Sequence, residues 1–87
     1  MQEYYINIPS KVLENKNLSD KAKILYGQIN RLSSKGNCWA SNKYLGDLID
    51  ATPRTVTRLI KKLKDNYLIK IETEIIQGIS QRKIICI

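Results

Sequence analysis

The stretch of sequence that decides the fold is SNKYLGDLIDATPRTVTRLIKKLKDN, residues 41–66. Ser41 is expected to cap a helix over about 42–49, because its hydroxyl can accept a hydrogen bond from a free N–H group of the first turn. The apolar side of that helix is formed by Leu45, Leu48 and Ile49. Asp50 and Ala51 then leave room only for a tight turn before the next helix begins.

A second helix is expected to follow at once and to run to about residue 66. Thr52 is a good N-terminal cap, and Pro53 takes the first helical position, where its missing N–H costs nothing. The apolar stripe of this helix is formed by Val56, Leu59, Ile60 and Leu63. Two helices joined by so short a turn predict a helix-turn-helix over residues 41–66.

The side of the second helix that the core does not need is cationic. Five lysines and arginines stand between Arg54 and Lys64, and only Asp65 opposes them. A merely solvated helix face is the alternative, but such a face usually mixes both signs of charge at a spacing of four. Arginine suits guanine O6 and N7, and threonine suits a thymine methyl or a phosphate oxygen. The residues of this helix expected to contact DNA are Arg54, Thr55, Thr57, Arg58, Lys61 and Lys62.

Two smaller groups of residues are further candidates for DNA contact. Ser41, Asn42 and Lys43 begin the first helix of the pair, where backbone N–H groups and small polar side chains suit a phosphate. A simple helix cap explains these three residues equally well. Arg82 and Lys83 are expected to reach a neighbouring groove or the DNA backbone, and scattered surface charge is an equally good account of them.

The remaining sequence supplies another helix and a hairpin. Residues 19–32 carry apolar side chains at the spacing of one helix face, and a short helical turn is expected after Pro9. Residues 67–76 and 81–87 alternate as two strands around a turn at 77–80, and residues 3–8 are rich in strand formers. Trp39 lies in a brief extended piece at 38–40. It is expected to anchor the core, with nucleotide stacking as the alternative.

These elements predict a single α+β domain, mainly α, over residues 1–87. The expected architecture is a winged helix-turn-helix, with a three-helix core, a C-terminal β-hairpin wing over about 67–87 and an N-terminal strand. Because the last strand is apolar and carries no polar tail, we expect the domain to be a piece of a longer protein.

Composition favours a nucleic-acid partner and argues against catalysis. The 87 residues carry a net charge of +7 with a pI of about 9.6, so a polyanion is the first partner to consider. The absence of histidine removes the commonest general base and the commonest metal ligand. No nucleophile elbow or glycine-rich phosphate loop is present. We therefore expect no enzymatic activity, no catalytic or metal-binding residues and no cofactor.

Cysteine and hydropathy patterns favour a reducing cytoplasm. Cys38 and Cys86 form no CxxC pair, and we interpret both as reduced, small apolar residues, with a disulfide between them as the alternative. No apolar run is long enough to span a membrane, and no basic-then-apolar leader is present, so no membrane partner is expected.

Five motifs spread over nearly the whole chain belong together: YYINIP, LSDKAKILY, CWASNKYL and LGDLIDATPRTV, followed by TRLIKKL. In these motifs the chain resembles the N-terminal domain of winged-helix proteins that initiate replication of plasmids, phages and mobile elements. The resemblance implies origin recognition in the cytoplasm of a bacterial host, with Thr55, Thr57 and Arg58 on the groove-facing helix. Two positions depart from the family pattern. Gly46 replaces the usual alanine, which should loosen the helix slightly, and Asp50 replaces a glycine in a left-handed turn.

Three functions remain open at this point. The first is origin recognition on double-stranded DNA, and the second is operator binding by a transcriptional regulator. The third is a protein-interaction module that recruits replication proteins such as a helicase or its loader. A homodimer is also expected, because Ile75, Ile76 and Ile79 crowd the tip of the wing; the alternative is that they complete the core of the monomer.

Overall fold

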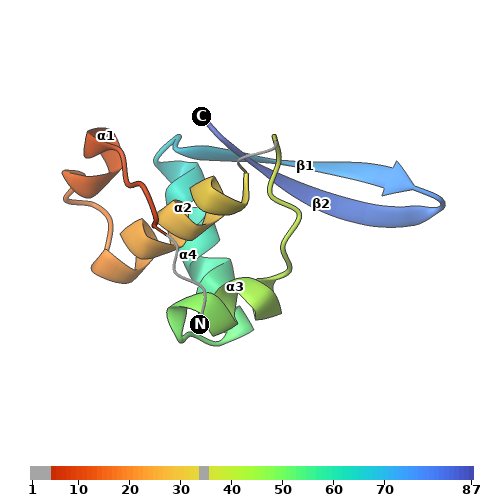
Figure 1. Cartoon of the computed structure of the whole chain (residues 1–87), viewed down its shortest axis with the longest axis horizontal. Coiled ribbons are helices and arrows are strands. Elements are labelled where there is room, and N and C mark those ends of the chain that lie inside the picture. The colour runs from red at the N-terminus through yellow and green to blue at the C-terminus, as the bar shows by residue number, and fades with distance from the viewer. Residues whose placement is uncertain (1–4, 34–35) are drawn as a thin grey trace.

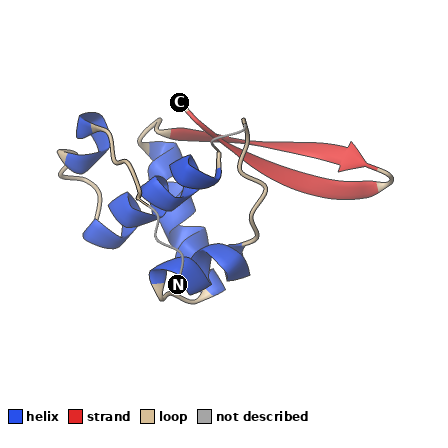
Figure 2. Ribbon diagram, in the orientation of Figure 1, coloured by secondary structure: helices blue, strands red, loops and turns tan. Residues whose placement is uncertain are grey.

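The helices of the chain gather at one end of the molecule and a β-hairpin projects from them (Figures 1 and 2). This computed structural model describes residues 5–33 and 36–87. The elements follow the order α1 (Ser10–Leu13), α2 (Asp20–Leu32), α3 (Asn42–Ile49), α4 (Pro53–Asp65), β1 (Ile69–Ile76) and β2 (Ile79–Cys86). The predicted α+β class, mainly helical, with a helix-turn-helix and a C-terminal wing, is confirmed.

Each of the three longer helices begins at a hydroxyl cap. The side chains of Ser19, Ser41 and Thr52 accept hydrogen bonds from the backbone N–H three residues later, at 3.1 to 3.2 Å. Each cap satisfies a donor that the helix itself leaves free and stabilises the helix by about 1 kcal/mol. The predicted starts of these helices are therefore confirmed, including Pro53 at the first position of α4.

The core lies where α2, α3, α4 and the base of the hairpin meet. Side chains with no exposed surface come from all four of these elements: Leu25, Ile29, Leu45, Val56, Leu63 and Ile84. Leu48, Leu59 and Ile71 are partly buried and pack against this cluster. The apolar stripes read from the sequence therefore face inward, and burying them supplies most of the driving force for folding.

The hairpin is tied to the helices at its base. β1 and β2 pair antiparallel from Ile69 with Cys86 to Ile76 with Ile79. The connecting turn is only Gln77 and Gly78, both left-handed with φ of 52° and 78°, which suits the twist of a two-residue hairpin. Cys38 exchanges two backbone hydrogen bonds with Ile84, of 3.0 and 2.8 Å, so the extended piece predicted at 38–40 forms a single β-bridge.

The predicted N-terminal strand is wrong for the residues that the structure describes. Residues 1–4 lie outside them, and residues 5–9 belong to no strand. Ile6 and Ile8 instead lie over α2 at Gly27, where an added Cβ would stand 3.0 Å from Ile6 and 3.2 Å from Ile8. Ile6 and Ile8 are thus partly buried against a helix that has no side chain at that point, and they need no sheet edge.

Trp39 is not a core anchor, contrary to the sequence prediction. Its side chain is 44% exposed, whereas Cys38 beside it is fully buried. Successive residues of an extended segment point to opposite sides, and Cys38 takes the inward side because its backbone is bridged to Ile84. The outward side is left to the tryptophan.

The turn between α3 and α4 depends on a close backbone contact. Asp50 takes the left-handed conformation, with φ of 56°, and the Ala51 N–H donates to the Gly46 carbonyl at 2.8 Å. A Cβ on Gly46 would collide with the carbonyl oxygen of Ala51. The expected loosening of the helix by Gly46 stays a prediction, and the structure adds a steric reason for glycine, because this turn leaves no space for a methyl group.

We predict that Gly46→Ala lowers the stability of the domain despite the higher helix propensity of alanine. The backbone must move to admit the methyl, and overpacking of this kind costs about 1–3 kcal/mol. A thermal melt should show a midpoint lower by roughly 4–8 °C for each kcal/mol lost. Asp50→Gly is the matched control: it relieves a left-handed non-glycine residue in the same turn and should not lower the midpoint. An unchanged or higher midpoint for Gly46→Ala would contradict the steric account.

Candidate nucleic-acid interface

The two sides of α4 differ sharply in chemistry. Val56, Ile60 and Leu63 are buried on the inner side. The exposed surface of α4 carries five cations, one threonine, one proline and a single carboxylate: Arg54, Arg58, Lys61, Lys62, Lys64, Thr57, Pro53 and Asp65. The helical period predicted this division into a buried side and an exposed side. Thr55 is half-buried and lies at the boundary between the two sides. α4 therefore presents a cationic surface of its own to solvent.

Few carboxylates neutralise this cationic surface. Among residues 5–33 and 36–87, no hydrogen bond or ion pair engages the side chains of Arg54, Arg58 and Lys62. Lys61 pairs with Asp65 at 3.0 Å, but both groups are well exposed. Such a surface pair is weak and screened, so Lys61 can exchange its partner for another anion.

The N-terminus of α3 adjoins this surface. Asn42 Nδ2 donates to Thr57 Oγ1 of α4 at 2.9 Å, which brings the first turn of α3 beside the outer face of α4. Lys43 pairs with Asp47 at 3.3 Å in another exposed pair. Ser41 caps the helix as expected. The structure thus brings the three predicted residues at 41–43 to the same region as Thr57.

Arg82 reaches this region from the hairpin, but its guanidinium is already engaged. Nη1 donates to Asn42 Oδ1 and Nη2 donates to the Ala40 carbonyl, both at 2.7 Å. Partial burial lowers the pKa of Arg82 from its ordinary value, and the nearby Cys38 opposes that shift. The sequence could not show this arrangement, because the hairpin register and the fold bring together residues that lie 40 positions apart.

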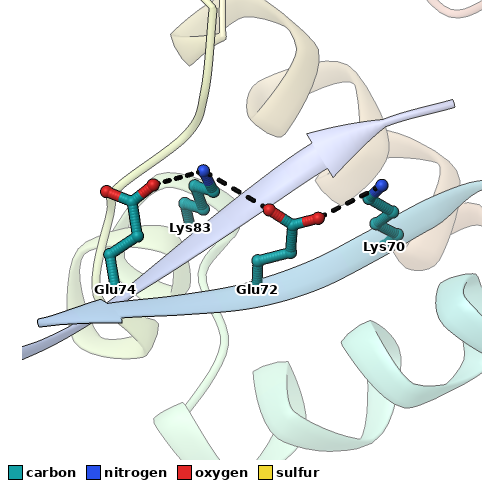
Figure 3. Close-up of polar contacts among 4 residues, drawn as sticks. All are labelled: Lys70, Glu72, Glu74 and Lys83. Carbon is teal, nitrogen blue, oxygen red and sulfur yellow. Dashed lines mark hydrogen bonds and ion pairs between the residues drawn. The ribbon is translucent and has the colours of Figure 1, made fainter.

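Lys83 points to the opposite, outer face of the hairpin, where it belongs to a chain of ion pairs (Figure 3). Its Nζ lies 2.6 Å from Glu74 and 3.3 Å from Glu72, and Glu72 also pairs with Lys70 at 3.1 Å. The pKa of Glu72 is lowered chiefly by a hydrogen bond from Lys70 and further by one from Lys83. The pKa of Lys83 is raised chiefly by its hydrogen bond to Glu74. Two lysines thus balance two glutamates, and this face of the hairpin carries little net charge.

A groove of about 300 Å³ separates α4 from the hairpin. Its lining combines apolar, cationic and amide side chains: Asn42, Thr57, Ile60, Lys61, Lys64, Asp65, Ile71 and Arg82. Four of these residues were not among the site residues expected from sequence: Ile60, Lys64, Asp65 and Ile71. The charge of Lys64 was visible there, whereas the position of Ile71 depends on how β1 packs against α4.

The comparisons with known proteins agree with this architecture. The family described as "Helix-turn-helix domain" matches residues 16–69, which is more than half of the chain. This chain belongs to the helix-turn-helix domain family. A solved structure titled "Structure of Rep-DNA complex" is similar in fold, with a TM-score of 0.67 and 17% sequence identity. The similarity covers 98% of this chain and 75% of that one. No curated protein sequence matches the chain.

The family match covers α2, α3 and α4, so the cationic surface lies within the helix-turn-helix domain proper. Three aromatic side chains within the matched residues are exposed: Trp39, Tyr44 and Tyr67.

Other kinds of site find little support in the described part of the domain. Residues 5–33 and 36–87 contain no group of three or more histidine, cysteine or acidic residues placed to hold a metal ion. Cys38 and Cys86 are free thiols, and burial raises the pKa of each. None of the described helices is long and apolar enough to cross a membrane.

Proposed function

We propose that this helix-turn-helix domain binds double-stranded DNA at specific sequences, with α4 in the major groove. The observation that carries the proposal is the outer surface of α4, where arginines and lysines gather with few carboxylates to neutralise them. A major groove admits one α-helix, and a second helix packed across it usually contacts the DNA backbone. α3 corresponds to that second helix, because it directly precedes α4 and packs against it.

Position along α4 divides the proposed contacts into two kinds. Arg54 and Arg58 lie one turn apart near the N-terminal end, where a recognition helix meets base edges. Arginine can donate two parallel hydrogen bonds to guanine, so these side chains suit base readout. Lys62 and Lys64 lie in the last turn, where phosphates are the expected partners. The N-terminus of α3, with Ser41 to Lys43, suits a further phosphate.

We further propose that the DNA site is a replication origin of a plasmid, phage or mobile element. The resemblance of the sequence to initiators of that kind supports this role, and so does the fold shared with a protein whose structure is titled as a Rep–DNA complex. A transcriptional regulator would use the same contacts at an operator. Selection of duplexes from a random pool separates the two roles: repeated copies of the selected site beside the encoding gene support origin recognition, and a lone copy over a promoter supports regulation.

We predict that binding to duplex DNA weakens steeply with salt. If the cations of α4 and Lys43 neutralise about four to six phosphates, log K should fall with log salt at a slope of roughly −4 to −5. Fluorescence anisotropy of a labelled duplex, titrated from low to physiological salt, measures this slope. A nearly flat slope, or no binding to any duplex, would contradict the proposal and favour a protein-interaction module.

We predict that Arg58→Ala and Lys62→Ala differ in kind. Arg58→Ala should cost about 1–3 kcal/mol on the selected site and relax its preference, because a base contact is lost. Lys62→Ala should weaken selected and scrambled duplexes about equally and reduce the salt slope by about one. Both side chains are exposed, so thermal melts should match the parent. If Arg58→Ala binds the selected site as tightly as the parent does, α4 is not the helix that contacts the bases.

We also propose that the domain self-associates through the tip of the hairpin. Ile75, Ile76 and Ile79 are 77%, 45% and 60% exposed, so they do not complete the core of the monomer. Ile79→Glu should shift a concentration-dependent dimer toward monomer, since the carboxylate would have to be buried in the interface. Sedimentation equilibrium of both proteins measures this shift. A parent that stays monomeric at high concentration would refute the proposal.

A further inference from the structure

A hydrogen-bonded chain crosses three elements at the proposed DNA-reading surface. Arg82 of β2 donates from Nη1 to Asn42 Oδ1 at 2.7 Å, and Asn42 Nδ2 donates to Thr57 Oγ1 at 2.9 Å. The Thr57 hydroxyl then donates to the Pro53 carbonyl at 3.1 Å. Every link runs in the same direction, from the wing through α3 to α4.

The direction of this chain is set at Arg82. A guanidinium has five donors and no acceptor, so the atom of Asn42 that faces it must be the amide oxygen. The amide NH₂ group is then turned toward Thr57, whose oxygen has to accept. The other terminal nitrogen of the guanidinium, Nη2, donates to the Ala40 carbonyl at 2.7 Å and holds the arginine itself in place.

The consequence falls on the exposed side chain of Thr57. Its one proton is given to Pro53 and one oxygen lone pair is taken by Asn42, which leaves a methyl group and a single acceptor site. A phosphate contact needs a donor, so Thr57 held in this way suits base edges instead, either a thymine methyl or an amino group.

We propose that Arg82 is a positioning residue for sequence readout: it fixes the orientation of Asn42 and Thr57 and does not itself bind DNA. The inference rests on the proposed function and deepens it, because it makes Arg82, a cation of the wing, a determinant of sequence specificity and not a phosphate contact. Two of its five donors are held by Asn42 and Ala40 and the side chain is partly buried, so Arg82 is less available to a phosphate than the exposed cations of α4.

The test compares Arg82→Met, Asn42→Ala and the double variant on the duplex that the parent selects and on a scrambled duplex. Arg82→Met should lower the ratio of selected to scrambled affinity by about tenfold, with the salt slope unchanged. The double variant should lose little more than either single variant, because both changes break one chain. Lys70→Met is the matched control: it removes one charge from the outer face of the same hairpin and should keep the parental preference.

Three results would overturn the proposal. One is an equal loss on both duplexes with a salt slope reduced by about one, which is the signature of a phosphate contact. Another is an undiminished preference in Arg82→Met. The third is additive losses in the double variant. A parent that selects no duplex would overturn the proposed function together with this inference, whereas a selective parent with an equally selective Arg82→Met overturns the inference alone.

A second variant keeps the test decisive if Arg82→Met fails to fold in a thermal melt. Asn42→Asp preserves an acceptor for Arg82 and places a negative charge in the first turn of α3, where it is favourable. Aspartate has no N–H to offer Thr57, so the chain stops there and the preference for the selected duplex should fall. A retained preference in Asn42→Asp would overturn the proposal as well.

Discussion

The contact between Gly46 and Ala51 is the constraint on which the rest of the domain depends. The Ala51 N–H reaches back to the Gly46 carbonyl at 2.8 Å, and no side chain fits between the two backbones. The start of α4 also comes close here, because a Cβ on Gly46 would stand 3.4 Å from Val56. Leu45 of α3 and Val56 of α4 are both fully buried. Since the apolar stripe of α4 faces inward, its arginines and lysines have to face solvent.

The wing depends on that arrangement in turn. Its base is held by backbone pairing of Cys38 with Ile84 and by the fork of Arg82 on the loop before α3. The outer face of the hairpin carries balanced ion pairs, whereas the side toward α4 contributes Arg82 to the groove. Among α3, α4 and the hairpin, the cations without a close carboxylate partner therefore lie chiefly on α4, and in our proposal the wing positions residues at that surface.

Departures from the sequence predictions share a physical cause. Trp39 and residues 5–8 were assigned from local composition, but burial at both places was decided by partners distant in sequence, Ile84 for the loop and Gly27 for the N-terminal segment. Arg82 and Lys83 are adjacent and similar in charge, yet strand alternation sends one to an amide in α3 and the other to glutamates on β1. Alternation separates the two faces of the strand, but only the fold shows which partners each face meets.

The sequence by itself determined the helices, their caps, the short turn and the cationic side of α4. Each of these follows from interactions within a few residues, namely helical periodicity, hydroxyl capping and the restricted φ of proline. Only the tertiary structure decided which cations remain available and why Gly46 is required, because both depend on backbone and side chains brought together from separate elements. The Arg82–Asn42–Thr57 chain is the plainest case: the sequence places these three residues in three separate candidate groups, and they acquire a common direction only once β2, α3 and α4 meet.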